Sequence, residues 1–278
     1  AYLELSSFMQ RGQFKEVSRN TLLERADVSS SVLSGLIDKG ILISYKREIS
    51  RLDTSGRSAE PAHALNTVQQ KALDQILHSF KDKEVTLLHG VTSSGKTEIY
   101  IHLIQEVIQK GRQVLYLVPE IALTTQLTTR LQRVFGDSLA IYHSKFTDNE
   151  RVEIWNNLLK DKGIRVILGV RSSIFLPFRD VGLVIVDEEH ENTYKQQDPA
   201  PRYHARNAAI VLASMHGAKT LLGSATPALE SYYNAQQGKY GFVELTSRFE
   251  DIQLPRILVA NTQELRRKKQ MTGNISPL

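Results

Sequence analysis

The sequence contains no cysteine, a single tryptophan and no long apolar run. Without cysteine, neither a disulfide framework nor a thiolate zinc site can form among these 278 residues. No apolar stretch approaches the roughly 18 residues that a membrane-spanning helix needs. Internal repeats and low-complexity tracts are absent as well. These absences exclude a disulfide-stabilised secreted domain and a repeat array, predict no membrane partner, and make an intracellular, cytoplasmic setting the default expectation.

The overall composition is that of a folded protein, with 41% hydrophobic and 23% charged residues. A chain of this length fits one large domain or two ordinary ones. The formal net charge of +5 mildly favours a polyanionic partner. The first residue is Ala1, with no leader-like segment after it, and the last residues, "GNISPL", contain no capping device. We therefore expect the chain to be a piece of a longer protein.

Residues 1–54 are predicted to form a small winged-helix domain. Two short amphipathic helices follow one another, and the second is expected to begin at Ser29 or Ser30 and to end at Gly40. The alternating stretch "ILISYKREI" predicts a strand that enters a basic turn, the wing. Residues 1–60 hold nine Lys or Arg against eight Asp or Glu, so DNA binding and simple packing against a neighbouring domain both remain open.

After a polar linker at residues 55–64, strand-like apolar runs alternate with amphipathic helical stretches up to residue 250. This alternation predicts an α/β fold whose parallel sheet is covered by helices on both faces. Ligands of such sheets bind beyond the carboxyl ends of the strands. Trp155 lies in the amphipathic stretch "NERVEIWNNLLK" and is predicted to be part of the core. The predicted strands are Val85–Leu88, Val114–Val118, Leu139–Tyr142, Val166–Leu168, Leu183–Val186 and Thr220–Leu222.

The stretch "LLHGVTSSGKTEIY" places a glycine-rich turn between a predicted strand and a predicted helix. Its spacing is the P-loop pattern, in which backbone N–H groups and a helix N-terminus surround a phosphate. Lys96 is expected to reach the β- and γ-phosphates of ATP, and Thr97 to ligate Mg²⁺. A helix-capping loop with a surface lysine is the plainer alternative. The predicted ATP-binding residues are Gly90, Val91, Thr92, Ser93, Ser94, Gly95, Lys96 and Thr97.

A second pattern, "VGLVIVDEEH", ends an apolar strand in adjacent carboxylates. Burying Asp187 and Glu188 together would be costly unless a cation or a water network meets them, and a P-loop with Mg²⁺ supplies that cation. We therefore expect Asp187 to hold the water shell of the metal and Glu188 to polarise the water that attacks the γ-phosphate. The alternative is an exposed acidic strand end that caps the next helix.

These and several other motifs resemble those of superfamily 2 helicases, in the same order. "DEEH" resembles motif II, in which His190 would couple the nucleotide site to DNA, and "LNTVQQKAL" looks like the Q-motif, with Gln69 or Gln70 recognising adenine. Residues 65–231 are similar to the PriA family of primosomal replication-restart helicases. The resemblance implies that residues 65–250 form a P-loop RecA-like lobe. The stretch "GSATPALES" resembles motif III, whose predicted coupling residues are Ser224, Ala225 and Thr226.

The same resemblance predicts where DNA would bind. "LVPEIALTTQL" is similar to motif Ia, with a plain strand-to-helix turn as the alternative, and "GVRSSIFLPF" is similar to the next DNA-contact motif, with a surface turn as the alternative. "YKQQDPAPRYHARN" resembles an aromatic loop that senses single strands, with Arg206 among its basic residues; packing of its tyrosines at the rim is the alternative. Pro201 stands where some members carry tryptophan. The predicted DNA contacts are Pro119, Glu120, Arg171, Ser172, Ser173, Tyr194, Lys195, Arg202 and Tyr203.

For the parent protein, the resemblance implies an ATP-dependent DNA helicase that moves 3′ to 5′, recognises stalled or repaired forks and restarts replication. Its cofactors would be ATP and Mg²⁺, and its partners branched and single-stranded DNA, the primosome and single-strand-binding proteins. Residues 251–278 would begin the connection to a second lobe, to which the family's zinc site and the arginines that stabilise the transferring phosphoryl group belong. We therefore expect this chain to bind ATP–Mg²⁺ and DNA weakly and to hydrolyse ATP poorly.

Two alternative functions remain open from the sequence. The chain could belong to another superfamily 2 DNA translocase, which would share the P-loop and "DEEH" but not the "YKQQDPAPRYHAR" block or the winged helix. It could instead be a nucleotide-gated DNA-binding module without turnover. In that case DNA would leave ATP hydrolysis unchanged, while the nucleotide would alter the affinity for DNA.

Overall fold

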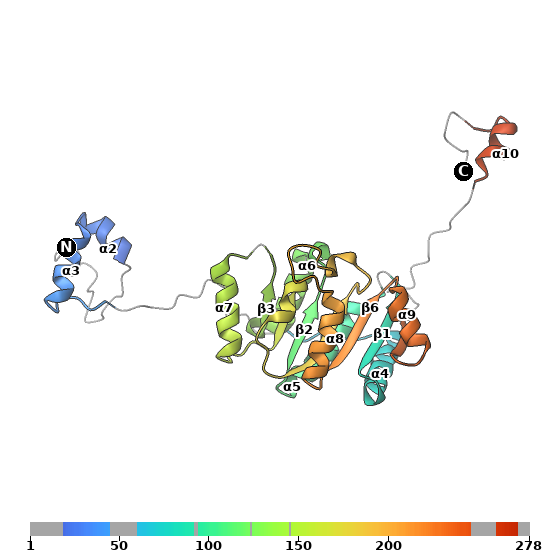
Figure 1. Ribbon diagram of the computed structural model, residues 1–278, viewed down its shortest axis with the longest axis horizontal. Coiled ribbons are helices and arrows are strands. Elements are labelled where there is room, and N and C mark those ends of the chain that lie inside the picture. The colour runs from blue at the N-terminus through green and yellow to red at the C-terminus, as the bar shows by residue number, and fades with distance from the viewer. Residues whose placement is uncertain are drawn as a thin grey trace. The chain divides into compact units, whose positions relative to one another are not determined.

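The computed structural model describes residues 19–44, 60–91, 94–122, 124–144, 146–245 and 260–271. The chain divides into two compact units, Ala1–Ser50 and Arg51–Leu278 (Figure 1). The first unit contains helices α2 (Arg19–Ala26) and α3 (Ser30–Asp38), which bury Leu22 and Leu33 respectively. Residues 41–44, predicted to begin the wing strand, form a bend and an irregular segment instead. The rest of the predicted wing, residues 45–50, lies outside the described ranges.

The second unit is built on a seven-stranded sheet in which every strand pair is parallel. The strand order is β3-β4-β2-β5-β6-β1-β7, which confirms the predicted RecA-like parallel sheet. Strands of such a sheet are apolar throughout because both faces are covered, and every residue of β2 and β4 is buried. The strands are β1 (Val85–Gly90), β2 (Gln113–Leu117), β3 (Leu139–Tyr142), β4 (Val166–Gly169), β5 (Val181–Asp187), β6 (Lys219–Ser224) and β7 (Gly241–Leu245).

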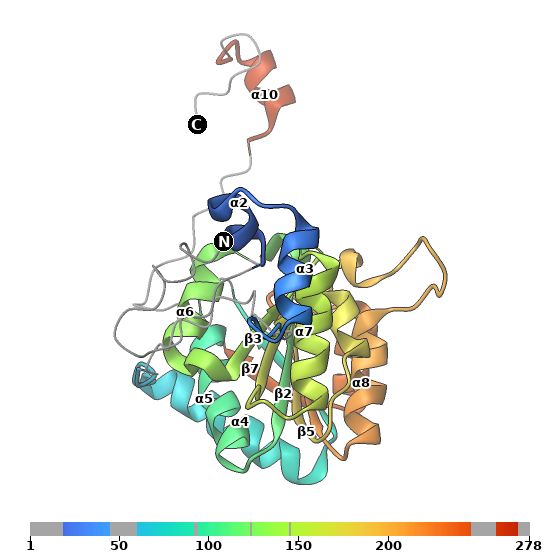
Figure 2. The same ribbon diagram turned by 90° about the vertical axis from the view of Figure 1, so that its left-hand side faces the viewer.

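Helices cover both faces of the sheet and produce two separate cores. Side chains of α4, α5 and α6 form the core on one face, and those of α7, α8 and α9 join the core on the other. Figure 2 shows α5 and α6 on one side of the sheet and α8 on the opposite side. None of the helices in the described residues is long and apolar enough to cross a membrane. Their bounds are α4 (Thr67–Asp82), α5 (Lys96–Gln109), α6 (Thr125–Phe135), α7 (Asp148–Leu159), α8 (Ala205–Met215), α9 (Leu229–Gln236) and α10 (Thr262–Arg267).

Two features of the second unit differ from the expectation. Strand β7 was not predicted, because it is a short edge strand whose outward residues Phe242 and Glu244 are exposed, which leaves only a weak apolar pattern. Trp155 was predicted to be part of the core, and this is wrong, since the side chain is 43% exposed. The helical period instead points Ile154 and Leu158 of α7 into the core, and Trp155 lies beside that buried stripe.

The two-faced sheet leads to a stability prediction for neighbouring residues of β1. Leu87 and Leu88 are both fully buried but contribute to opposite cores. We expect Leu87→Ala and Leu88→Ala each to lower the free energy of unfolding by about 2–5 kcal/mol, measured by urea denaturation. Val68→Ala, at a position of α4 that is 40% exposed, is the control and should cost far less. A loss in only one of the two leucine variants would contradict a sheet buried on both faces.

Candidate active site

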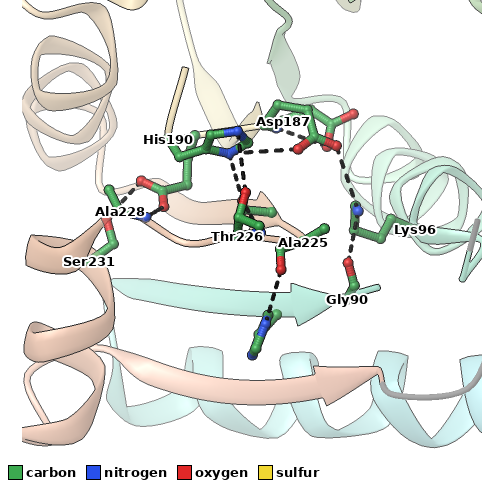
Figure 3. A network of polar contacts seen from close by, with 12 residues as sticks. Gly90, Lys96, Asp187, His190, Ala225, Thr226, Ala228 and Ser231 are labelled. Atoms are coloured by element: carbon green, nitrogen blue, oxygen red, sulfur yellow. Dashed lines mark hydrogen bonds and ion pairs between the residues drawn. The ribbon is translucent and has the colours of Figure 1, made fainter. Parts of the chain in front are cut away.

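Three neighbouring strands bring the predicted motifs together. In the sheet, β5, β6 and β1 are adjacent and parallel, so their carboxyl ends lie side by side. Strand β1 leads into the P-loop at Gly90, β5 ends at Asp187, and β6 ends at Ser224. Figure 3 shows Lys96 and His190 on either side of Asp187 at this edge. This is the edge of an open parallel sheet at which ligands bind.

The described part of the P-loop depends on its two glycines. The Lys96 ammonium donates to the Gly90 carbonyl oxygen at 3.0 Å, and a Cβ at Gly90 would lie 3.1 Å from the Lys96 side chain. Gly95 precedes α5 with a φ of 83°, and a Cβ there would lie 2.1 Å from Nε2 of Gln69. A larger residue would therefore disturb the turn at either position. Thr92 and Ser93 lie outside the described residues.

Glu188 lies opposite the P-loop lysine. Its Oε1 is 3.7 Å from the Lys96 ammonium, and Lys96 itself is only 9% exposed. Its Oε2 is 3.7 Å from Nδ1 of His190. The backbone of Glu188 has a φ of 46°, in the left-handed region that residues with a side chain rarely adopt. Such a conformation costs roughly 1 kcal/mol or more and is concentrated at functional sites.

Both carboxylate oxygens of Asp187 accept hydrogen bonds from the protein. Oδ1 accepts from the Tyr100 hydroxyl at 3.0 Å and from the Glu188 amide at 3.1 Å, and Oδ2 accepts from the Tyr116 hydroxyl at 3.2 Å. Burial, followed by the charge of Glu188, raises the pKa of Asp187 to about 6, although Lys96 and Tyr100 act in the opposite direction. The adjacent carboxylates are thus only partly compensated by one lysine, an environment that a divalent cation would complete.

Polar groups around the P-loop fit a nucleotide with Mg²⁺. Within the described ranges, the Ser94 hydroxyl and Nε2 of Gln69 are buried without a hydrogen-bond partner. The Thr97 side chain interacts with the Tyr116 hydroxyl, which also binds Asp187. The described residues hold no cluster of three or more His, Asp or Glu that could bind a metal by itself. Mg²⁺ is commonly held by one or two carboxylates together with substrate phosphates, so this arrangement suits it.

His190 connects the end of β5 to the segment after β6. Its Nδ1 hydrogen-bonds with the Ser224 hydroxyl at 2.8 Å, and its Nε2 with the Thr226 hydroxyl at 3.4 Å. The amide of Thr226 donates to the Ser224 hydroxyl at 3.0 Å. The carbonyl of Ala225 lies 3.2 Å from Nε2 of His89 on β1. The structure therefore brings all three predicted coupling residues next to the β5 end.

Glu189 was missed by the sequence reasoning, although it is the most completely buried charge at this edge. It has no exposed surface, and its Oε2 is 2.8 Å from the Arg206 guanidinium and accepts from the Ser231 hydroxyl at 2.7 Å. Its Oε1 accepts from the Ala228 amide at the start of α9 at 2.7 Å (Figure 3). Arg206 was predicted to face single-stranded DNA, and this is wrong because its charge is buried against Glu189. Only the doubled glutamate in "DEEH" could have indicated such a role.

Gln69 occupies a position between a helix cap and the P-loop. Its Oε1 accepts from the Asn66 amide at 3.0 Å, and Oδ1 of Asn66 accepts from the Gln69 amide at 2.8 Å, which forms a capping box at the start of α4. Its Nε2 lies against Gly95. Gln70, the other candidate, is exposed and donates to Asp74 at 3.0 Å. Recognition of adenine by Gln69 stays a prediction, with one of its two polar atoms already engaged.

Three predicted DNA contacts are wrong in this structure, because their side chains are buried. Pro119 is buried at the end of β2. Ser173 has no exposed surface, and its hydroxyl occupies the space that a Cβ at Gly169 would need. Tyr194 is 1% exposed, and its hydroxyl donates to the Asp187 carbonyl at 2.7 Å. The short 3₁₀ turn η4 (Asn192–Tyr194) places this tyrosine beneath the end of β5. Its ring therefore packs inside the protein, where it does not stack on DNA bases as predicted.

The loop after "DEEH" returns on itself, and Tyr203 at its end packs partly against the core. Lys195 pairs with His204 in an antiparallel bridge, and Tyr203 packs edge-on against Phe175 with ring centroids 4.9 Å apart. Arg171 donates to the carbonyls of Thr193 and Lys195, both at 3.2 Å, and so braces this loop. The predicted contacts that are exposed are Glu120, Ser172 and Arg202.

Comparison with known proteins identifies relatives of the chain. Residues 66–235 match the DEAD/DEAH box helicase family, and residues 1–49 match the winged helix domain of PriA helicase from Bacteroidota. The chain is 41% identical over 251 residues to replication restart protein PriA of Bacillus subtilis (strain 168), covering 88% of this chain and 31% of that protein. It is 40% identical over 255 residues to the protein of the same name from Haemophilus influenzae, covering 88% and 34%. The chain thus spans about one third of the length of these curated relatives.

Among solved structures, RecG bound to a three-way DNA junction aligns with a TM-score of 0.48 and 20% sequence identity, over 82% of this chain and 26% of that chain. This likeness is too weak to support an inference. The helicase match, in contrast, covers more than half of the chain. On that basis, this chain belongs to the DEAD/DEAH box helicase family and is similar over most of its length to replication restart protein PriA.

Proposed function

We propose that this chain is the ATP-binding lobe, with an adjoining winged helix, of a DNA helicase that moves 3′ to 5′. It acts at stalled or repaired replication forks and helps restart replication. The observation that carries the proposal is the meeting of Lys96 and Glu188, 3.7 Å apart beside Asp187, at the ligand edge of the sheet. The similarity to proteins named replication restart protein PriA supports the setting. DEAD/DEAH box helicases use ATP and Mg²⁺.

The residues around the P-loop have separate roles in the binding and hydrolysis of ATP. Lys96 binds the β- and γ-phosphate oxygens, and the P-loop spacing from Gly90 to Thr97 predicts that backbone N–H groups surround the phosphates. Thr97 and Asp187 hold Mg²⁺, which when bound neutralises charge on the phosphates. Glu188 accepts a hydrogen bond from the attacking water and orients it. Its closeness to Lys96 supports this role, because the same lysine is proposed to bind the γ-phosphate.

We propose that DNA contacts the loop that follows the end of β5. Lys195 and Arg202 supply positive charge, Tyr203 supplies a ring, and Arg171 keeps the loop in place. His190 then links Glu188 to the segment after β6, so that a shift in either place changes the position of the other. We propose this link as the path between DNA and the hydrolysis of ATP.

Other parts of the longer protein complete the motor. We propose that a second RecA-like lobe supplies the arginines that stabilise the transition state, and that the family's zinc site belongs to that region. The partners would be fork and single-stranded DNA, the primosome and single-strand-binding proteins, in the cytoplasm. This chain alone should therefore bind ATP–Mg²⁺ and DNA weakly and turn ATP over slowly.

The first test removes the P-loop ammonium. We expect Lys96→Ala to weaken binding of a fluorescent ATP analogue with Mg²⁺ by at least about tenfold, because the side chain that pairs with the phosphates is lost. Lys110→Ala, at the exposed end of the same helix, is the matched control and should bind as the unchanged chain does. Equal affinity in Lys96→Ala and the control would contradict a P-loop nucleotide site.

The second test separates binding from chemistry. Glu188→Gln keeps the shape of the side chain but cannot accept the proton of water, so the analogue should bind normally while hydrolysis falls at least about 100-fold. Single-turnover hydrolysis with protein in excess over ATP, with and without fork DNA, measures this even in a slow enzyme. Glu191→Gln, in the same segment, serves as the control. Normal hydrolysis in Glu188→Gln would remove this residue from the mechanism, and hydrolysis that DNA leaves unchanged would favour a nucleotide-gated binding module.

A further inference from the structure

Two buried tyrosines donate to the carboxylate at the end of β5. Tyr100 lies on α5 and Tyr116 on β2, and both are fully buried, with their rings edge-on and centroids 5.5 Å apart. Their hydroxyls donate to the two different oxygens of Asp187, at 3.0 and 3.2 Å. Buried tyrosine hydroxyls need a partner, and here the partner is the side chain predicted to face the metal. The two rings alone could be supplied by phenylalanine; the hydroxyls could not.

The backbone of β6 is adapted to this arrangement. Gly223 stands opposite Asp187 in the parallel register, and a Cβ on Gly223 would lie 1.8 Å from the Tyr100 hydroxyl and 3.4 Å from Oδ1 of Asp187. Only glycine leaves room for the Tyr100 hydroxyl at that point. The first residue of the "GSAT" segment therefore serves the same contact, and four elements of the fold (α5, β2, β5 and β6) converge on one carboxylate.

The two tyrosines make unequal contributions. Oδ1 of Asp187 has two donors, the Tyr100 hydroxyl and the Glu188 amide, whereas the Tyr116 hydroxyl is the donor to Oδ2 among the described residues. Tyr116 also interacts with the Thr97 side chain. It therefore connects the two residues, Thr97 and Asp187, that the proposed function assigns to Mg²⁺.

We propose that Tyr116, assisted by Tyr100, is a positioning residue that fixes the Asp187 carboxylate relative to Thr97 so that Mg²⁺ can be bound with the nucleotide. This inference rests on the proposed function. Oδ2 of Asp187 keeps a lone pair after accepting from Tyr116, so it can still bind the metal or a water of its shell, whereas both lone pairs of Oδ1 are occupied by Tyr100 and the Glu188 amide. Side chains that hydrogen-bond a metal ligand orient it, and removing one typically costs 10- to 100-fold in metal affinity.

The test measures how strongly Mg²⁺ improves nucleotide binding in this chain. ATP affinity is determined by calorimetry in EDTA and across a titration of MgCl₂, for Tyr116→Phe, Tyr100→Phe and the control Tyr233→Phe, whose side chain is 61% exposed on α9. We expect the half-saturating Mg²⁺ concentration to rise about tenfold in Tyr116→Phe, less in Tyr100→Phe, and not at all in Tyr233→Phe. ATP affinity in EDTA should be the same in all of them.

Urea unfolding of the nucleotide-free variants distinguishes positioning from packing. If Tyr116→Phe and Tyr100→Phe lose stability but keep the Mg²⁺ dependence of the unchanged chain, the tyrosines only pack, and the inference is overturned. If Mg²⁺ does not raise the ATP affinity of the chain without substitutions, that result would contradict the proposed function itself. A gain that the tyrosine variants retain in full would contradict this inference alone.

Discussion

At the end of β5 two adjacent carboxylates are only partly compensated by one lysine, and this charge arrangement depends on the alignment of three parallel strands. Burial and the charge of Glu188 raise the pKa of Asp187 to about 6, and Lys96, at the start of α5 after β1 and the P-loop, lies 3.7 Å from Glu188. A slip of one residue in either strand pairing would turn the acidic side chains to the opposite face of the sheet. The apolar residues that fix this register therefore also fix the chemistry of the site.

The four residues of "DEEH" reach four different sets of partners within one turn. Asp187 meets buried tyrosine hydroxyls, Glu188 meets the P-loop lysine, Glu189 meets Arg206 and α9, and His190 meets the segment after β6. The left-handed φ of 46° at Glu188 ends the alternation of the strand and allows successive side chains to diverge in this way. The acidic pair is thus anchored on both sides, by the sheet before it and by α8 and α9 after it.

Burial accounts for the sequence-based predictions that were wrong. Tyr194 and Ser173 lie in motifs that resemble DNA contacts, yet their side chains fill space beneath the strand ends. Arg206 is likewise occupied by Glu189. Trp155 shows the reverse error, since an aromatic residue in an amphipathic helix can lie just outside the buried stripe. In each case the residue type indicated a role, but the sequence did not show where the side chain points. That direction depends on which residues the tertiary structure places next to it.

The sequence by itself determined the α/β class, six of the seven strands and the two motifs that meet at the site, because these depend on local periodicity and on fixed spacing within a short stretch. The parallel order β5-β6-β1, the buried Glu189–Arg206 pair and the Tyr116–Asp187 contact were decided only by the tertiary structure. Their partners lie far apart in the chain, and nothing in the local pattern of either one specifies the other. Long-range packing determines which polar side chains are buried together, because each of them needs a hydrogen-bond partner once water is excluded.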